Sequence, residues 1–164
     1  MRTLMIGFLL LAAGALPAAA ATAPAPETAA PAPAASPLEP FDRFVDALNK
    51  GDMETAAATF TASPSMIDEF PSFYWQGAGA FSAWVEDFGA FSQASGQTEG
   101  QMHTDAPSYS VVGEASAYYV VPAHYIYKDH GKPAVEDGAF AVVTKRDEAG
   151  WKIASWAWAG TMPK

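Results

Sequence analysis

The last third of the sequence constrains the fold most, because it contains three alternating β-rich segments separated by two turns. The segments run from 115 to 128, from 134 to 146 and from 151 to 160. The residues between them are rich in Gly, Asp and Pro, which favour tight turns. Short β-rich runs divided by such turns predict an antiparallel meander.

The N-terminus has the features of a secretory signal peptide. Met1 and Arg2 give it a positively charged start, residues 4–16 are apolar, and residues 17–21 are small, as at a cleavage site. A membrane-spanning helix needs roughly twenty apolar residues, and here the apolar run breaks at Pro17. We therefore expect residues 1–21 to be removed on export, which predicts a periplasmic or secreted protein with no stable membrane anchor.

Residues 22–37 consist mostly of Ala, Pro, Thr and Glu. Such a segment cannot bury enough apolar surface to offset its ordering entropy, so it is predicted to be a disordered spacer. Residues 38–164 then form one domain, which is long enough for a single hydrophobic core. The chain has no cysteine, so neither a disulfide framework nor a lipid-modified cysteine is available to it.

The formal net charge of −9 argues against a nucleic-acid partner, because acidic proteins repel phosphate backbones. A metal site is not expected either. His103 and Asp105 share one side of an extended segment, but a metal needs three or four convergent ligands and only His124 could join them. There is no Gly-rich phosphate loop in the sequence, so no cofactor is predicted.

Helices are predicted before the meander. Apolar residues recur at i, i+3, i+4 and i+7 from Phe41, within a helix that runs from 40 to 51. Asp52 is placed to cap a second helix at 53–60. The same apolar spacing from Phe81 predicts a third helix.

The remaining segments complete an α+β pattern. A strand-like stretch from 66 to 76 is interrupted by Pro71, which confines it to a sheet edge or a bulge. Residues 96–100 are expected to form a loop. Helices followed by an antiparallel meander predict a curved sheet with helices on one face.

The order of these segments resembles the nuclear transport factor 2-like superfamily, and more narrowly its SnoaL-like bacterial members. The resemblance rests on the motif FDxFVxALNxGD at 41–52, an irregular strand ending at Gly77, an aromatic helix, and a Gly-Trp-Lys-Ile strand at 150–153. It implies a cone-shaped, curved antiparallel sheet with the N-terminal helices packed on its concave face, also called cystatin-like. This fold serves several enzyme classes and also non-catalytic binding modules, so it does not define a reaction.

The resemblance also implies a conical cavity, and the alternation of strand side chains sorts residues by face. Trp156 and Trp158 are expected inside. On the segment 115–128, Pro122 predicts a bulge, after which His124 replaces Tyr125 in the cavity if the alternation switches. The other residues expected to point inward are Tyr119, Val121, Ala123, Asp137, Ala139, Ala141, Val143 and Ala154.

Large aromatic residues beside small alanines are typical of an apolar small-molecule pocket, although the same aromatics could simply fill a core. The predicted partner is therefore a small apolar or aromatic molecule. The residues expected to contact it are Tyr74, Trp84, Tyr119, Tyr125, Trp156 and Trp158.

Two function classes follow from the resemblance. One is a non-catalytic ligand-binding protein. The other is a lyase or isomerase of the ketosteroid-isomerase or polyketide-cyclase type, in which a cavity carboxylate acts as general base. The resemblance implies Asp68, with Tyr74 beside it, or Asp137 as that base. Ala139 and Ala141 depart from the polar residues that catalytic relatives place on this strand.

The resemblance further implies a homodimer formed through the open face of the sheet. Tyr118 and Trp151 are expected to point outward there. Together they would leave an apolar patch of a kind that monomers rarely expose.

Overall fold

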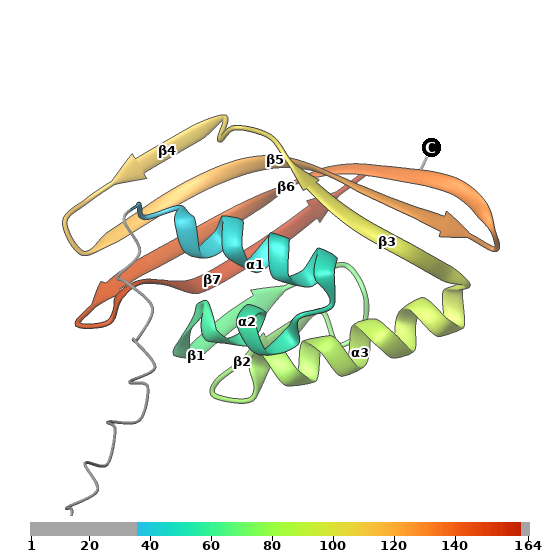
Figure 1. Cartoon of the computed structure of the whole chain (residues 1–164), viewed down its shortest axis with the longest axis horizontal. Coiled ribbons are helices and arrows are strands. Elements are labelled where there is room, and N and C mark those ends of the chain that lie inside the picture. The colour runs from blue at the N-terminus through green and yellow to red at the C-terminus, as the bar shows by residue number, and fades with distance from the viewer. Residues whose placement is uncertain (1–35, 162–164) are drawn as a thin grey trace, which may run out of the picture. The chain divides into compact units, whose positions relative to one another are not determined.

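The computed structural model describes residues 36–161, so the predicted signal peptide and nearly all of the predicted spacer lie outside the described residues. The predicted order of helices followed by a meander is confirmed (Figure 1). No helix in the described part is both long and apolar enough to cross a membrane. The elements are α1 (Glu39–Lys50), α2 (Met53–Ala58), β1 (Phe60–Ile67), β2 (Tyr74–Gln76), α3 (Ala80–Ser95), β3 (Gln97–Thr104), β4 (Tyr109–Val112), β5 (Ser116–Asp129), β6 (Lys132–Asp147) and β7 (Gly150–Gly160).

Local signals set the ends of the helices. A proline stands in the first turn of α1, where its missing N–H costs nothing, and Gly51 ends this helix in the left-handed region at φ 70°. The Asp52 carboxylate accepts a hydrogen bond of 3.0 Å from the Thr55 N–H and caps α2, as predicted. The second helix is shorter than expected, because Phe60 already belongs to β1.

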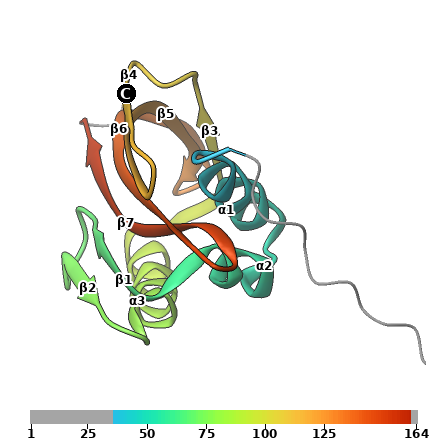
Figure 2. The ribbon, with the colours of Figure 1, turned by 90° about the vertical axis from the view of Figure 1, so that its left-hand side faces the viewer.

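The strands form one curved sheet in the order β2-β1-β7-β6-β5-β3, with β4 also paired to β5 (Figure 2). The meander of β5, β6 and β7 is antiparallel, as predicted. One pairing differs from a purely antiparallel sheet, since β1 runs parallel to β7. The single strand predicted at 66–76 is in fact part of two paired strands, β1 and β2, and Pro71 lies in the connection between them.

The predicted loop at 96–100 is wrong, because β3 starts at Gln97 and pairs with β5. The strand is polar and lies at the edge of the sheet, so it has no strong alternation that sequence reasoning could detect. The short edge strand β4 was missed for a related reason, because all four of its residues are exposed.

The helices pack on the concave face of the sheet, as predicted (Figure 2). The Phe41 ring on α1 meets the Phe140 ring on β6 at a centroid distance of 5.1 Å. The Trp84 ring on α3 meets the Trp156 ring on β7 edge-on at 5.4 Å. These contacts join both helices to the sheet in one aromatic core.

The predicted inward face of β5 is confirmed for Val121 and Ala123, which are buried. The predicted bulge at Pro122 is wrong, because the pairing of β5 with β6 runs through this residue without a register shift. The alternation therefore does not switch at Pro122, and the Tyr125 side chain, not that of His124, belongs to the inner face.

The predicted inward face of β6 is also wrong. Directly paired residues of antiparallel strands share a face, and Val121 pairs with Phe140 while Tyr125 pairs with Glu136. The even-numbered residues therefore point into the core. The residues that this places on the outer face, against expectation, are Asp137, Ala139, Ala141 and Val143.

A β-bulge explains the inner face of β7. Thr144 pairs with Ile153, whereas the preceding residue of β6, Val143, pairs with Ser155, so Ala154 is an extra residue. The alternation of faces shifts by one residue at this bulge. Ala154 therefore does not point inward, contrary to the prediction. Trp151, which is upstream of the bulge, and Trp156 and Trp158, which are downstream, are consequently all buried on the concave side. The expectation that Trp151 points outward is therefore wrong.

Candidate functional site

The concave face encloses a cavity of about 300 Å³ that is partly open to solvent. Its walls come from α1, α3, β3 and the inner faces of β5, β6 and β7. Its aromatic lining comprises Phe44, Phe70, Trp84, Phe88, Phe91, Tyr125, Phe140, Trp156 and Trp158. Its polar lining includes Asn49, Asp68, Glu69, Ser92, Gln97, Thr98, Glu99 and Glu136.

Ring contacts hold the aromatic wall rigid. Trp84 stacks on Phe88 with centroids 5.5 Å apart, one turn further along α3. On the sheet side, the Phe140 and Trp158 rings lie 4.8 Å apart. Aromatic pairs of this kind have preferred geometries, so the wall is preorganised without a ligand.

The polar end of the cavity contains three carboxyl groups, from Asp68, Glu69 and Glu136. The Trp84 indole N–H donates to Asp68 Oδ2 at 2.9 Å. The Trp158 indole N–H donates to Glu136 Oε1, also at 2.9 Å. Two aromatic wall residues thus hold two of the acids in place.

Burial and mutual repulsion disfavour negative charge at this end. Burial raises the pKa of Asp68 to about 6, although the Trp84 hydrogen bond opposes the shift. The pKa of Glu69 rises to about 7, because of burial first and then of the charge and hydrogen bond of Glu136. Burial, with smaller effects from Tyr127 and the carboxylates, raises the pKa of Tyr125 to about 12. Near neutral pH the cavity therefore contains carboxyl groups that can take up or release a proton.

Asn49 ties the end of α1 to the edge strand at the side of the cavity. Its side-chain amide donates to the Met102 carbonyl oxygen at 2.7 Å, and its Oδ1 accepts from the Met102 N–H at 2.8 Å. Both residues line the cavity. This paired hydrogen bond fixes the distance between α1 and β3.

Two glycines make room for the acidic end. A Cβ at Gly138 would lie 2.6 Å from ring atoms of Trp158, and a Cβ at Gly160 would collide with Glu136 and approach the Glu69 carboxylate. Any side chain at these positions would displace the Trp158 ring or the carboxyl groups.

Solved structures share this architecture. A nuclear transport factor 2-like superfamily protein from Salmonella enterica serovar Typhimurium matches with a TM-score of 0.59 and 22% identity, over 74% of this chain and 86% of that one. An NTF2-like protein with a cystatin-like fold from Novosphingobium aromaticivorans matches with a TM-score of 0.59 and 16% identity, over 74% and 77%. The chain has the nuclear transport factor 2-like (NTF2-like) fold.

A third solved structure with the NTF2-like fold is a type 2 hexachlorocyclohexane dehydrochlorinase, LinA. It matches with a TM-score of 0.64 and 7% identity, over 76% of this chain and 82% of that one. At such identities the likeness concerns the fold alone. No family model and no curated protein matches the sequence.

Five of the predicted site residues lie in the cavity wall: Asp68, Trp84, Tyr125, Trp156 and Trp158. Two predicted ligand contacts lie elsewhere. Tyr74 on β2 is 51% exposed, because its strand places Trp75 inward instead, and it is not part of the cavity lining. Tyr119 points inward and is buried, as predicted, but it packs in the core and is not part of the cavity lining.

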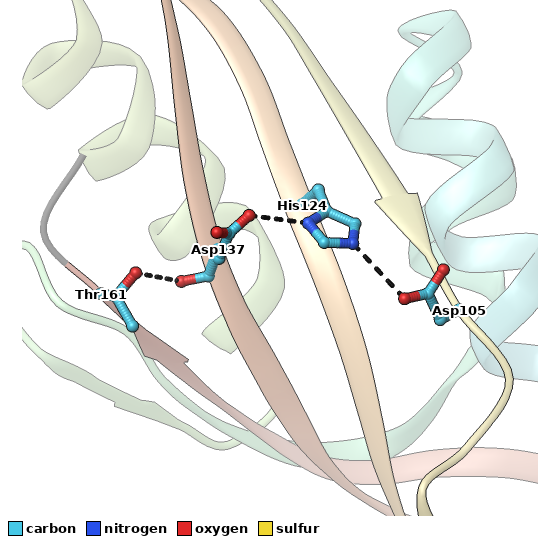
Figure 3. A network of polar contacts seen from close by, with 4 residues as sticks. All are labelled: Asp105, His124, Asp137 and Thr161. Atoms are coloured by element: carbon cyan, nitrogen blue, oxygen red, sulfur yellow. Dashed lines mark hydrogen bonds and ion pairs between the residues drawn. The ribbon is translucent and has the colours of Figure 1, made fainter. Parts of the chain in front are cut away.

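Asp137 is not a cavity base in this NTF2-like fold, because its side chain lies on the outer face of the sheet (Figure 3). Its Oδ1 lies 2.8 Å from His124 Nδ1, and Asp105 Oδ2 lies 3.4 Å from the other ring nitrogen of this histidine. Hydrogen bonds that the protonated His124 ring donates to Asp137 and then to Asp105 raise the pKa of His124. Within residues 36–161 no cluster of His, Asp and Glu has the arrangement of a metal site.

Sequence reasoning missed Glu69 and Glu136. Glu136 directly precedes Asp137, the residue that was predicted. The sequence pattern of β6 does indicate Glu136. Phe140 and Val142 are the large apolar residues of β6, and their even numbering assigns Glu136 to the inner face.

Proposed function

We propose that this chain is an exported NTF2-like protein that binds a small molecule in the cavity beneath its sheet. The observation that carries the proposal is a partly open cavity of about 300 Å³ whose aromatic walls end in three carboxyl groups. An apolar hollow with a few polar groups at one end is the usual form of a small-molecule site. The N-terminal sequence supports export.

A second candidate function is a lyase or isomerase that uses a cavity carboxylate as general base. The observation that favours it is the raised pKa of Glu69, about 7, since a base works best when its pKa lies near the operating pH. The dehydrochlorinase with the same fold supports this class of reaction. Under this proposal Glu69→Gln abolishes turnover but leaves substrate affinity nearly unchanged.

The binding proposal predicts that a neutral apolar fluorophore, N-phenyl-1-naphthylamine, binds one to one and quenches tryptophan emission. The Leu48→Trp variant, which adds bulk to the cavity wall, should abolish this binding while circular dichroism shows an intact fold. The matched control is Val112→Trp, which adds an indole at an exposed position outside the cavity lining. Equal probe binding by the wild type and Leu48→Trp would contradict the proposed site.

We propose a second copy of the chain as the partner of the sheet's outer face. A row of uncharged residues crosses five strands there, and pairwise register places its members side by side. Tyr118 and Val111 lie in the next row of the same face. The apolar patch on the outer face therefore includes Tyr118, as predicted, but not Trp151, which is buried on the concave side. The residues of the first row are Ile67, Ala157, Ala141, Val120 and Tyr109.

This surface predicts a homodimer in sedimentation velocity at micromolar concentration. Val111→Asp should give a monomer, because a charge would then be buried without a partner at the interface. Val112→Asp is the matched control, since the neighbouring residue is equally exposed but points to the opposite face of β4. A wild-type monomer, or equal effects of both variants, would overturn the proposed interface.

A further inference from the structure

We propose that the molecule bound in this cavity is an organic cation, namely a small ammonium ion with an aromatic or aliphatic body. The proposal rests on the proposed binding function and names the chemical class of its ligand. Two features of the cavity carry it: the charge of its polar end and the chemistry of its walls.

The polar end is acidic and has no basic counterpart. Asp68, Glu69 and Glu136 all line it, while no Lys, Arg or His is found among the described residues of the lining. The one further carboxylate of the lining, Glu99, already forms an ion pair of 2.6 Å with Lys128. Three acids grouped in a hollow without a cation leave a local negative potential that a positively charged ligand would neutralise.

The walls suit a cation as well. Aromatic faces and edges surround the space, and an ammonium group within about 6 Å of a ring centroid is attracted by the ring quadrupole. The indole N–H groups of Trp84 and Trp158 are already directed at carboxylates, so they are not free to hold an anionic ligand. The same contacts fix two acids at the edge of the aromatic wall, where an ammonium group would meet both.

The protonation of the cavity acids predicts how the affinity for the cation changes with pH. Burial and the Glu136 charge raise the pKa values of Asp68 and Glu69 to about 6 and about 7, so both acids are increasingly neutral below neutral pH. A bound cation favours their ionised forms. Affinity for the cation should therefore rise as the pH increases through this range, and binding should release protons.

Isothermal titration of the full chain with three ligands of similar shape tests the proposal. These are 2-phenylethylammonium, neutral 2-phenylethanol and anionic phenylacetate. Near pH 8 the ammonium ion should bind at least about tenfold more tightly than the alcohol, and phenylacetate should bind most weakly. Near pH 5 the advantage of the ammonium ion over the alcohol should shrink.

Isosteric variants test whether the cavity acids cause the tighter binding of the ammonium ion. Asp68→Asn and Glu136→Gln should each reduce ammonium affinity about tenfold or more and leave alcohol affinity unchanged. Asp87→Asn is the matched control and should change neither, since Asp87 also accepts an indole N–H, from Trp75, but does not line the cavity.

The possible failures are distinguishable. Equal affinities of the alcohol and the ammonium ion would overturn the cation proposal while the binding function stands. If N-phenyl-1-naphthylamine also fails to bind, the proposed function falls with it. An ammonium preference that survives in both cavity variants would place the cation elsewhere and overturn the proposal.

Discussion

Replacing Trp156 with alanine should lower the free energy of unfolding by about 3–5 kcal/mol, the usual cost of truncating a buried aromatic residue. Trp156 is 2% exposed. Its ring packs against Phe44 at 6.2 Å, Trp84 at 5.4 Å and Phe140 at 5.5 Å between centroids. Removing it would therefore open a void between α1, α3 and the sheet. Chemical denaturation followed by circular dichroism measures the loss.

The control for this prediction is Phe73→Ala, which truncates an aromatic residue that is 55% exposed. It should change the free energy of unfolding by less than about 1 kcal/mol. If Trp156→Ala cost no more than this control, Trp156 would not be a structural link between the helices and the sheet.

The Asp68→Asn variant should be more stable than the wild type near pH 8, by up to about 3 kcal/mol, because a rise in pKa of one unit corresponds to about 1.4 kcal/mol. The pKa of Asp68 is raised from 3.8 to about 6 in the folded protein, mainly by burial. Between these values the folded state binds more protons than the unfolded state, so wild-type stability falls as pH rises from about 4 to 6. Asparagine has no charge to bury, so the variant lacks this dependence of stability on pH.

Thermal unfolding across pH 3 to 8 measures this difference. The matched control is Asp87→Asn, because Asp87 Oδ2 also accepts an indole N–H, from Trp75 at 2.8 Å, but does not line the cavity. This control should bring no gain in stability near pH 8. A constant difference between Asp68→Asn and the wild type at every pH would contradict burial of a charge at Asp68.

The elements that could be predicted are those with strong local signals. Gly51 and Asp52 fixed the junction of the first two helices, and the turns around Gly131 and Gly150 fixed the meander. The edge strands β3 and β4 lacked such signals, because they are paired on one side and largely exposed. Their formation depends on the hydrogen-bonding edge that β5 provides, which is a tertiary property.

The candidate site could be predicted where alternation was uninterrupted or where an aromatic residue marked the inner face. Trp84 and Tyr125 were placed in the cavity on these grounds, and Trp158 was placed there by the resemblance to known proteins. The assignment of Asp137 failed because alternation gives two possible faces, and the choice ignored the large apolar residues Phe140 and Val142. Glu69 lies in the irregular connection between β1 and β2, whose course no periodic pattern can supply.

The bulge at Ala154 divides β7 into two alternation frames. Trp151 and Ile153 follow one frame and Trp156 and Trp158 the other, and no unbroken strand could bury all four. The neighbouring strand β1 changes its register against β7 at the same level, so both strands depart from regular pairing together. The cavity wall therefore depends on the bulge in β7 as much as on the identity of its residues. If β7 paired regularly through Ala154, Trp156 and Trp158 would lie on the outer face of the sheet while Trp151 and Ile153 stayed inside.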